Sequence, residues 1–227
     1  MKALCISDTH SQHQLFPKWK YKGVDLIIHA GDATNYKDVS RNYNEMVDFL
    51  EWYSELPIKY IVYVAGNHDA SMYHKAFNKK DLEAMGIIYL ENSEVVIEGI
   101  KIYGSPMTPT YGDWYFMANR SKINKYWQMI PEDTDILVTH GPPKYILDTV
   151  EHNQEFSRSV GCSALAKTVH KIEPDYHIFG HIHSQSNIIN SGIYQNNIIK
   201  TKYINASCVT DGKFEKGLTS FGHIITI

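Results

Sequence analysis

The chain has 227 residues, of which 43% are hydrophobic and 21% charged, and its formal net charge is −3. A chain of this length fits one α/β domain with a sizeable core, so we expect residues 1–227 to form a single domain. The slightly acidic balance weighs against a dedicated binder of DNA or RNA polymers, because such proteins carry a positive excess. A charged fraction near the globular average also argues against wholesale disorder.

Three features of the sequence bear on location. No apolar window approaches the length of a membrane span, and the apolar run before Asp8 is too short for a secretory signal. The three cysteines, Cys5, Cys162 and Cys208, are scattered and show no paired spacing. We therefore predict reduced thiols and a cytoplasmic protein without a membrane partner.

The first part of the chain alternates between predicted strands and a predicted helix. Residues 2–7 and 25–29 are short apolar runs, as expected for strands that are buried on both faces. Residues 37–56 place apolar side chains near helical spacing and stop before Pro57, which predicts a helix. Residues 60–65 form a third apolar run and a third predicted strand.

The second part alternates in the same way and ends in further strands. Units of this βαβ type, followed by strands, favour a layered α/β fold in which both parts of the chain supply strands. We predict helices at 121–129 and 163–172, strands at 135–139 and 176–179, and a strand-rich segment at 188–227 that is clearest at 203–206 and 223–227.

Each of the five predicted strands before residue 180 ends at a polar turn whose side chains can bind a metal ion. In open α/β sheets, ligands bind outside the carboxyl ends of the strands, so these side chains are expected to converge. This expectation depends only on their position along the strands. The candidate ligands are Asp8, His10, Asp32, Asn67, His140, His181 and His183.

The residue types of this set suit a catalytic metal centre. Carboxylate, imidazole and amide groups bind Mn²⁺, Fe, Zn²⁺ or Ni²⁺, and the absence of cysteine from these turns argues against a structural zinc site. Asp8 and His10 are two residues apart, as are His181 and His183, which puts each pair on one face of an extended segment. Seven ligands are too many for one catalytic metal with an open position, and they fit two metals that share a carboxylate.

Plainer interpretations stay open for single residues. An isolated aspartate after a strand usually caps a turn, so Asp8 or Asp32 alone would be a weak signal. The aromatic segment 103–116 could stack on a nucleobase or form a hydrophobic cluster under a loop. Arg158 lies before a predicted helix, where it could bind a phosphate or be solvated.

Five short motifs occur in order along the chain: Asp8-Thr9-His10, Gly31-Asp32, Gly66-Asn67-His68-Asp69, Thr139-His140-Gly141 and Gly180-His181-Ile182-His183. With this ordered set the sequence resembles the calcineurin-like metallophosphoesterases. Further stretches, such as Tyr103-Gly104-Ser105-Pro106 and Val160-Gly161-Cys162, resemble the subgroup of metallophosphoesterase-domain-containing proteins.

The resemblance implies a four-layer α/β/β/α sandwich, with two mixed sheets flanked by helices. It also implies two divalent metal ions, with Mn²⁺ favoured over Fe, Zn²⁺ and Ni²⁺. It further implies how the ligands divide. Asp8, His10 and His183 would hold one metal, Asn67, His140 and His181 would hold the other, and Asp32 would bridge them.

The implied activity is hydrolysis of a small nucleotide-like or cyclic phosphodiester by a hydroxide that bridges the two metals. His68 is expected to supply a proton to the leaving group. Many family members carry a carboxylate three residues after the bridging aspartate, whereas Asn35 stands at that position here. An amide can orient the ring of His68 but cannot offset its charge, and Asp69 could compensate. We therefore expect a preference for substrates whose leaving group needs less assistance from a proton donor.

Other functions stay open beside this one. A phosphomonoesterase or protein phosphatase is disfavoured because residues 31–35 lack the Asp-Arg extension of the protein phosphatases. A nuclease is disfavoured by the acidic balance, and a metal-binding scaffold without turnover by the full set of candidate ligands. We expect a small phosphoester as the partner and not a nucleic-acid polymer.

Overall fold

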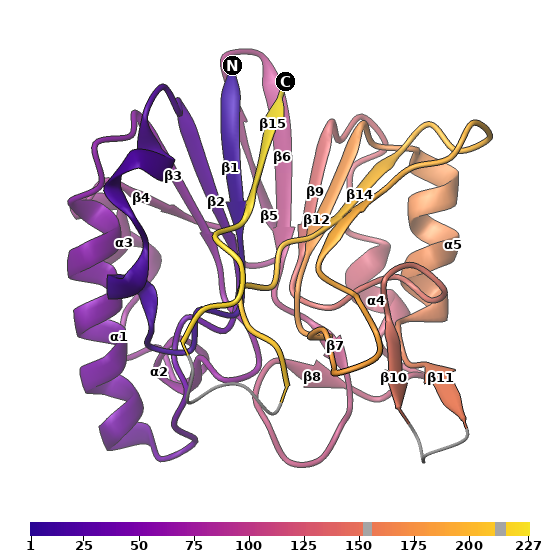
Figure 1. Ribbon diagram of the computed structural model, residues 1–227, viewed down its shortest axis with the longest axis horizontal. Helices are drawn as coiled ribbons and strands as arrows, with labels where there is room; N and C mark the ends of the chain where they lie inside the picture. The colour runs from indigo at the N-terminus through magenta and orange to yellow at the C-terminus, as the bar shows by residue number, and fades with distance from the viewer. Residues whose placement is uncertain (152–155, 212–216) are drawn as a thin grey trace.

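The computed structural model describes residues 1–151, 156–211 and 217–227. Figure 1 shows two sheets side by side in the middle of the molecule, with helices on both outer sides. The first sheet has the order β15-β1-β2-β3-β4, in which β1 to β4 are parallel and β15 is antiparallel to β1. Its strands are β1 (Lys2–Ile6), β2 (Leu26–Ala30), β3 (Tyr60–Val64), β4 (Ile87–Tyr89) and β15 (His223–Thr226).

The second sheet is also mixed and has the order β13-β14-β12-β9-β6-β5. Its four central strands are parallel, whereas the edge strands β13 and β5 are antiparallel to their neighbours. The strands are β5 (Ser93–Ile97), β6 (Ile100–Ser105), β9 (Ile136–Thr139), β12 (Tyr176–Phe179), β13 (Gly192–Tyr194) and β14 (Lys202–Asn205).

Helices cover the outer face of each sheet, and short elements lie at the lower end in Figure 1. Helices α1 and α3 flank the first sheet, and α4 and α5 flank the second. The helices are α1 (Val39–Ser54), α2 (Ala70–Tyr73), α3 (Lys79–Ala84), α4 (Asn124–Trp127) and α5 (Ser163–Ile172), with 3₁₀ turns η1 (His13–Leu15) and η2 (Lys18–Tyr21) and the short pairs β7 (Thr108–Pro109)/β8 (Met117–Ala118) and β10 (Thr149–Glu151)/β11 (Ser157–Ser159).

The alternation of side chains along each strand explains the layers. Cys5 of β1 packs between the two sheets, in the same cluster as Val138 of β9. Its neighbour Leu4 points the other way and packs in the cluster that includes Phe49 of α1. Successive side chains of a strand point to opposite faces, so strands covered on both sides are apolar throughout.

The predicted four-layer fold is confirmed, and all five strands predicted before residue 180 are present. The helix predicted at 37–56 begins at Val39, because the side chain of Asp38 accepts the N–H of Arg41 and caps it. The helix predicted at 121–129 shortens to α4, since turns occupy the flanking residues.

The elements between residues 79 and 105 were not predicted from the sequence. They comprise α3, the parallel strand β4 and the hairpin of β5 and β6. The hairpin turns at Glu98 and Gly99, both at positive φ, which suits the right-handed twist of the strands. In the part of the chain that the structure describes, no helix is both long enough and apolar enough to cross a membrane.

Candidate metal centre

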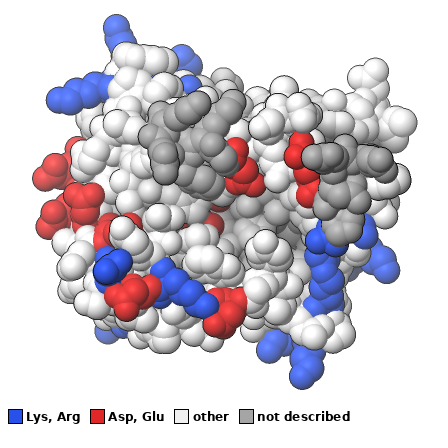
Figure 2. Space-filling model, turned by 60° about the horizontal axis from the view of Figure 1, so that its bottom comes forward, with Lys and Arg blue, Asp and Glu red and all other residues white. Residues whose placement is uncertain are grey.

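The candidate ligands lie at the carboxyl ends of strands from both sheets. Asp8 follows β1 and Asp32 follows β2, while His140 follows β9 of the second sheet. The parallel strands of both sheets end on the same side of the molecule, at the bottom of Figure 1. Figure 2 shows that face, which is hollowed near its middle. This placement is the one expected for a ligand site in an open α/β sheet.

Several of these residues have left-handed backbone, which is uncommon for side chains with a Cβ. The φ angles are 52° for Asp8, 42° for His10, 56° for Asp32 and 69° for His181. Backbone bonds hold two of these turns in place, from Asp8 N to Gly31 O at 2.8 Å and from His10 N to Asp32 O at 3.1 Å. Such strain persists only where the surroundings enforce it, and it clusters at functional sites.

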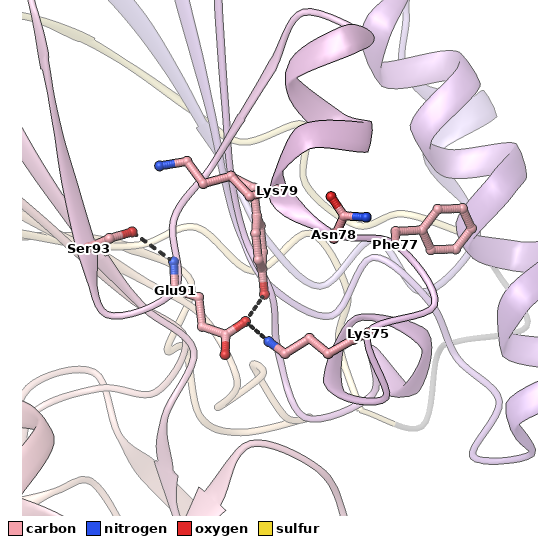
Figure 3. Close-up of a pocket in the computed structure, with 7 residues that line it drawn as sticks. Lys75, Phe77, Asn78, Lys79, Glu91 and Ser93 are labelled. Carbon is pink, nitrogen blue, oxygen red and sulfur yellow. Dashed lines mark hydrogen bonds and ion pairs between the residues drawn. The ribbon is translucent and has the colours of Figure 1, made fainter.

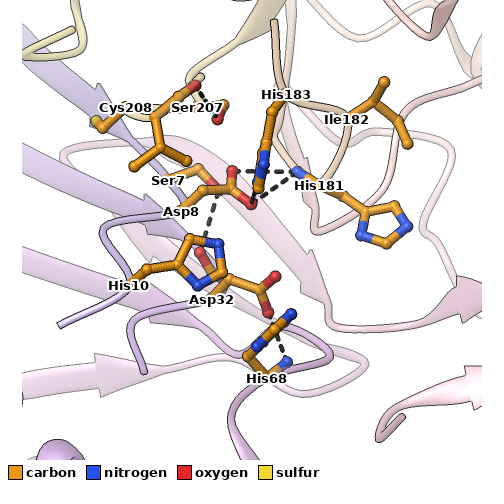
Figure 4. A network of polar contacts seen from close by, with 12 residues as sticks. Ser7, Asp8, His10, Asp32, His68, His181, Ile182, His183, Ser207 and Cys208 are labelled. Carbon is orange, nitrogen blue, oxygen red and sulfur yellow. Dashed lines mark hydrogen bonds and ion pairs between the residues drawn. The ribbon is translucent and has the colours of Figure 1, made fainter. Parts of the chain in front are cut away.

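A first group of potential ligands consists of Asp8, His10 and His183, whose ligand atoms all lie within 4.8 Å of one another. His183 Nε2 lies 3.1 Å from Asp8 Oδ1. The backbone N–H of His181 donates to both carboxylate oxygens of Asp8, at 3.1 Å each. Figure 4 shows the rings of His10 and His183 turned toward the Asp8 carboxylate.

A second group consists of Asp32, His140 and His181, again with ligand atoms within 4.8 Å of one another. His140 Nε2 lies 3.2 Å from Asp32 Oδ2 and 3.0 Å from Asn67 Oδ1, so Asn67 belongs to the same neighbourhood. Asp32 is also within this distance of His10. The Asp32 carboxylate therefore lies between the two groups.

The outer ring nitrogens show which atoms are available to a cation. His140 Nδ1 lies 2.9 Å from Ala30 O, and His10 Nδ1 lies 3.1 Å from Thr34 O. A carbonyl only accepts, so each Nδ1 carries the proton and donates it, which leaves Nε2 as the ligand atom. Both rings are thus oriented by backbone carbonyls on either side of Asp32, one at the end of β2 and one in the loop that follows it.

The electrostatics of the centre are those of buried ion pairs. Burial opposes ionisation of Asp32, but the neighbouring histidine rings, chiefly His140, outweigh it and hold the pKa of this carboxyl well below its ordinary value. Burial likewise opposes protonation of His140, yet the charge of Asp32 raises the pKa of His140 to about 9. His10 differs, since burial lowers its pKa to about 4 and the ring stays neutral. A cation would replace the protons of the paired rings.

These residues fit divalent cations. Carboxylate, imidazole and amide donors gather in two overlapping groups, and the rings that have an outer backbone partner present Nε2. This donor chemistry suits Mn²⁺, Fe, Zn²⁺ or Ni²⁺ and leaves the choice among them open.

His68 lies at the edge of the centre. Its backbone N–H donates to Asp32 Oδ1 at 2.7 Å, and its Nδ1 lies 2.9 Å from the backbone carbonyl of Asn35. The ring stacks on the indole of half-buried Trp114, with centroids 4.0 Å apart and planes at 30°. Asn35 therefore orients the ring through its main chain and not through its amide.

Asp69 lies beneath the loops that carry the ligands. Its buried carboxylate accepts the backbone N–H groups of Asp32 and Thr34 at 3.0 Å each, and that of Gly66 at 2.7 Å. Burial and the charge of Asp32 raise the pKa of Asp69 to about 6. Its carboxylate also accepts the hydroxyl of Thr34 at 2.9 Å. Asp69 thus joins two loops, and the described hydrogen bonds do not include one to the ring of His68.

Two residues near the centre were not singled out from the sequence. Trp114 lies within the aromatic segment 103–116, whose other members divide between core and surface: Tyr103 and Phe116 are buried. Asp211 lies 2.7 Å from His183 Nδ1, and it belongs to no motif that could have marked it. Arg158 is exposed on β11.

A separate pocket of about 250 Å³ lies between α3 and β4. Figure 3 shows Glu91 accepting from Lys75 at the edge of the pocket, at a distance of 2.5 Å. Glu91 also accepts from the hydroxyl of Tyr89 at 2.9 Å. None of the candidate ligands lines this pocket. Its charges are paired locally, and it gives no indication of a second site.

A four-layer sandwich with a buried cluster of aspartates and histidines at its strand ends is the arrangement expected for the metallophosphoesterase class of proteins. The sequence model of the calcineurin-like phosphoesterases matches residues 1–185. The chain belongs to this family.

Among its relatives, metallophosphoesterase domain-containing protein 1 of Homo sapiens is 35% identical over 231 residues, which cover 91% of this chain and 66% of that protein. A UPF0046 protein of Caenorhabditis elegans is 32% identical over 226 residues, which cover 93% of this chain and 71% of the relative. The match to the human relative thus spans slightly less than two thirds of that protein. The structure of phosphopantetheinyl hydrolase from Mycobacterium tuberculosis shares the fold, with a TM-score of 0.58, 14% identity, and 99% and 95% of the two chains covered.

Proposed function

We propose that the chain is a phosphodiesterase that hydrolyses a small nucleotide-like or cyclic phosphodiester at a dinuclear metal centre. The observation that carries the proposal is the position of Asp32, within reach of His10 on one side and of His140 on the other. One cation belongs with Asp8, His10 and His183, and the other with the His140 group, with Asp32 shared. Two bound cations supply Lewis acidity and an activated water at neutral pH.

Proton transfer to the leaving group and positioning of the bridging carboxylate are the roles of two further side chains. His68 donates Nδ1–H to the Asn35 carbonyl, so its Nε2 is the atom that exchanges a proton with the leaving oxygen. General acid catalysis of this kind is typically worth about 10²–10⁴-fold. Asp69 holds the loops of Asp32 and Gly66 in register and thereby positions the bridging carboxylate.

The contacts described for the arginines are not with the candidate ligands, which favours a diester over a monoester substrate. A monoester dianion carries one more negative charge, and enzymes commonly bind such groups with bidentate arginines. The chain has three arginines. The guanidinium of Arg41 lies over the Tyr36 ring, that of Arg120 donates to the backbone carbonyls of Gly161 and Val160, and Arg158 is exposed on β11.

Trp114 supports a substrate that carries a nucleobase. Its indole lies against His68, on the side of the centre where the leaving group would depart. Lys37 Nζ lies 5.7 Å from the same ring and is paired with Asp113 at 2.6 Å. An aromatic surface beside the proton donor suits a flat, uncharged base, and stacking of this kind is worth about 1–3 kcal/mol per base.

The test uses the purified chain with added Mn²⁺ and two chromogenic substrates. We expect hydrolysis of bis(p-nitrophenyl) phosphate well above that of p-nitrophenyl phosphate, followed by turnover within a panel of cyclic and linear nucleotide diesters. Asp32→Ala and His140→Ala are expected to abolish turnover and to remain folded by circular dichroism. A preference for the monoester, cleavage of DNA or RNA polymers above all small diesters, or no turnover with any divalent metal would overturn the proposal.

A further inference from the structure

His183 lies between two carboxylates. Its Nε2 is 3.1 Å from Asp8 Oδ1, on the side of the candidate metal centre, and its Nδ1 is 2.7 Å from Asp211 Oδ1, on the opposite side. Figure 4 shows the ring standing beside the Asp8 carboxylate. A carboxylate only accepts, so without a cation both ring nitrogens carry a proton, Nδ1–H donating to Asp211 and Nε2–H to Asp8. A cation held beside Asp8 would replace the Nε2 proton, while Nδ1–H would still donate outward to Asp211.

Asp211 is fixed in this position by the loop that carries His183. Its backbone N–H donates to Ser184 O at 2.8 Å, and Thr210 forms a parallel bridge with Ser184. Gln185 Nε2 donates to the second carboxylate oxygen, Oδ2, at 3.3 Å. Asp211 is thus held beside His183 by a backbone hydrogen bond and by contacts at both of its carboxylate oxygens.

The segment before Asp211 also reaches the loop after β1. Ser207 bridges Ser7, and Cys208 N donates to Ser7 O at 2.9 Å. Ser7 immediately precedes Asp8. The segment 207–211 therefore contacts both loops that supply the first ligand group, although it lies beyond the residues matched by the family model.

The outer partners of the three oriented rings differ in charge. His10 and His140 donate from Nδ1 to the neutral backbone carbonyls of Thr34 and Ala30. His183 donates from Nδ1 to a carboxylate. A carboxylate partner fixes the tautomer more strongly and makes the imidazole a better donor to a cation. The two ligand groups are therefore unequal in their outer surroundings.

We propose that Asp211 is a positioning residue that strengthens cation binding selectively at the group of Asp8, His10 and His183. It acts through His183 and does not ligate the cation itself. The inference rests on the dinuclear centre proposed above. Loss of such an outer partner typically lowers metal affinity by about 10–100-fold.

The experiment is a titration of the metal-free protein with Mn²⁺ alone, in which free Mn²⁺ is measured by electron paramagnetic resonance. We expect wild type to bind two equivalents. Asp211→Ala is expected to weaken one equivalent by about 10–100-fold and to leave the other unchanged. Asp211→Asn keeps an acceptor of the same shape without its charge, and is expected to lie between the two.

The matched control is Asp48→Ala. Asp48 Oδ2 pairs with Nε2 of the buried His13 at 3.0 Å, so this change also removes a carboxylate from a histidine, but outside the ligand groups. We expect both equivalents to bind as in wild type. Equal weakening in Asp48→Ala and Asp211→Ala would mean that the effect is a general loss of structure, and would overturn the assignment.

Background variants identify which group responds. In His183→Ala, adding Asp211→Ala is expected to change nothing further, whereas in His181→Ala it is expected to weaken the remaining equivalent. Nitrogen NMR of the metal-free protein gives a readout without metal, because the Nδ1–H of His183 should lose the signal of its hydrogen bond to a carboxylate in Asp211→Ala. Unchanged affinities in both Asp211 variants would overturn this inference alone. Fewer than two equivalents in wild type would overturn the dinuclear centre and this inference together.

Discussion

His140 Nε2 lies 3.2 Å from Asp32 Oδ2, so a ring that follows a strand of one sheet meets a carboxylate that follows a strand of the other. Both side chains are buried. The contact forms only if the two sheets pack at the correct distance and with their strand ends aligned. Gly66 lies directly beside this contact, where there is no room for a side chain. A Cβ on Gly66 would lie 2.3 Å from Asp32 Oδ1 and 2.7 Å from His140 Cε1.

Gly66→Ala is therefore expected to push Asp32 and His140 apart. Overpacking of this kind typically costs about 1–3 kcal/mol of stability. We expect that loss in urea unfolding, together with the loss of at least one of two Mn²⁺ equivalents. Gly141→Ala is the matched control, since its Cβ would meet the Thr108 methyl at 3.1 Å and the His181 ring only at an ordinary contact distance of 3.7 Å. Normal Mn²⁺ binding by Gly66→Ala would contradict the tight packing at this contact.

His68→Ala is expected to affect substrates according to their leaving group. A diester with an alkoxide leaving group needs the proton and should lose about 10²–10⁴-fold in kcat, whereas p-nitrophenoxide should lose far less. Asn35→Ala keeps the backbone carbonyl that accepts from His68, so its rates should stay close to wild type. Steady-state kinetics with the two substrate types measures both. Equal losses for the two leaving groups in His68→Ala would exclude the role of proton donor.

Trp114→Ala is expected to discriminate between substrates with and without a nucleobase. Loss of stacking should lower kcat/KM for a nucleotide diester relative to a diester without a base. The expected factor corresponds to about 1–3 kcal/mol of lost binding free energy. Any effect through His68, whose ring contacts the indole, acts on both substrates and cancels in the ratio. Trp114→Phe should restore most of the ratio. If the ratio of the two kcat/KM values is unchanged in Trp114→Ala, the nucleobase does not stack on Trp114.

His177 is expected to make the fold less stable in acid. Its ring is buried, and its Nε2 shares a hydrogen bond of 2.8 Å with Thr139 Oγ1. Burial lowers the pKa of His177 to about 3. The unfolded chain takes up this proton below pH about 6.5 and the folded chain does not. The free energy of unfolding therefore falls as the pH drops from about 6.5 toward 3, by up to about 1.4 kcal/mol per pH unit for this group.

The matching experiment is urea unfolding of metal-free protein between pH 7.5 and 5. In His177→Gln the amide keeps a polar group near the Nε2 position but cannot titrate, so the acid slope should be shallower. Some slope should remain, because burial also lowers the pKa of His29 to about 3. His170→Gln, on the exposed side of α5, should follow wild type. Parallel curves for His177→Gln and wild type would refute this account.

The sequence by itself determined the strand ends and what they carry. Short apolar runs that end in Asp8, Asp32 or His140 are local patterns, and the parallel arrangement of such strands brings their ends together. It did not determine β4 or the hairpin of β5 and β6, because short strands at the edge of a sheet depend on the neighbour against which they pack. These elements became visible only in the tertiary structure.

The tertiary structure decided which groups surround the ligands. Asn35 supplies a backbone carbonyl and not its amide, and Asp69 bonds to loop backbone, although both are near His68 in sequence or space. Trp114 and Asp211 reach the centre from segments far along the chain. Side-chain directions and long-range contacts follow from how the two sheets and their loops pack, and a linear pattern holds no record of that packing.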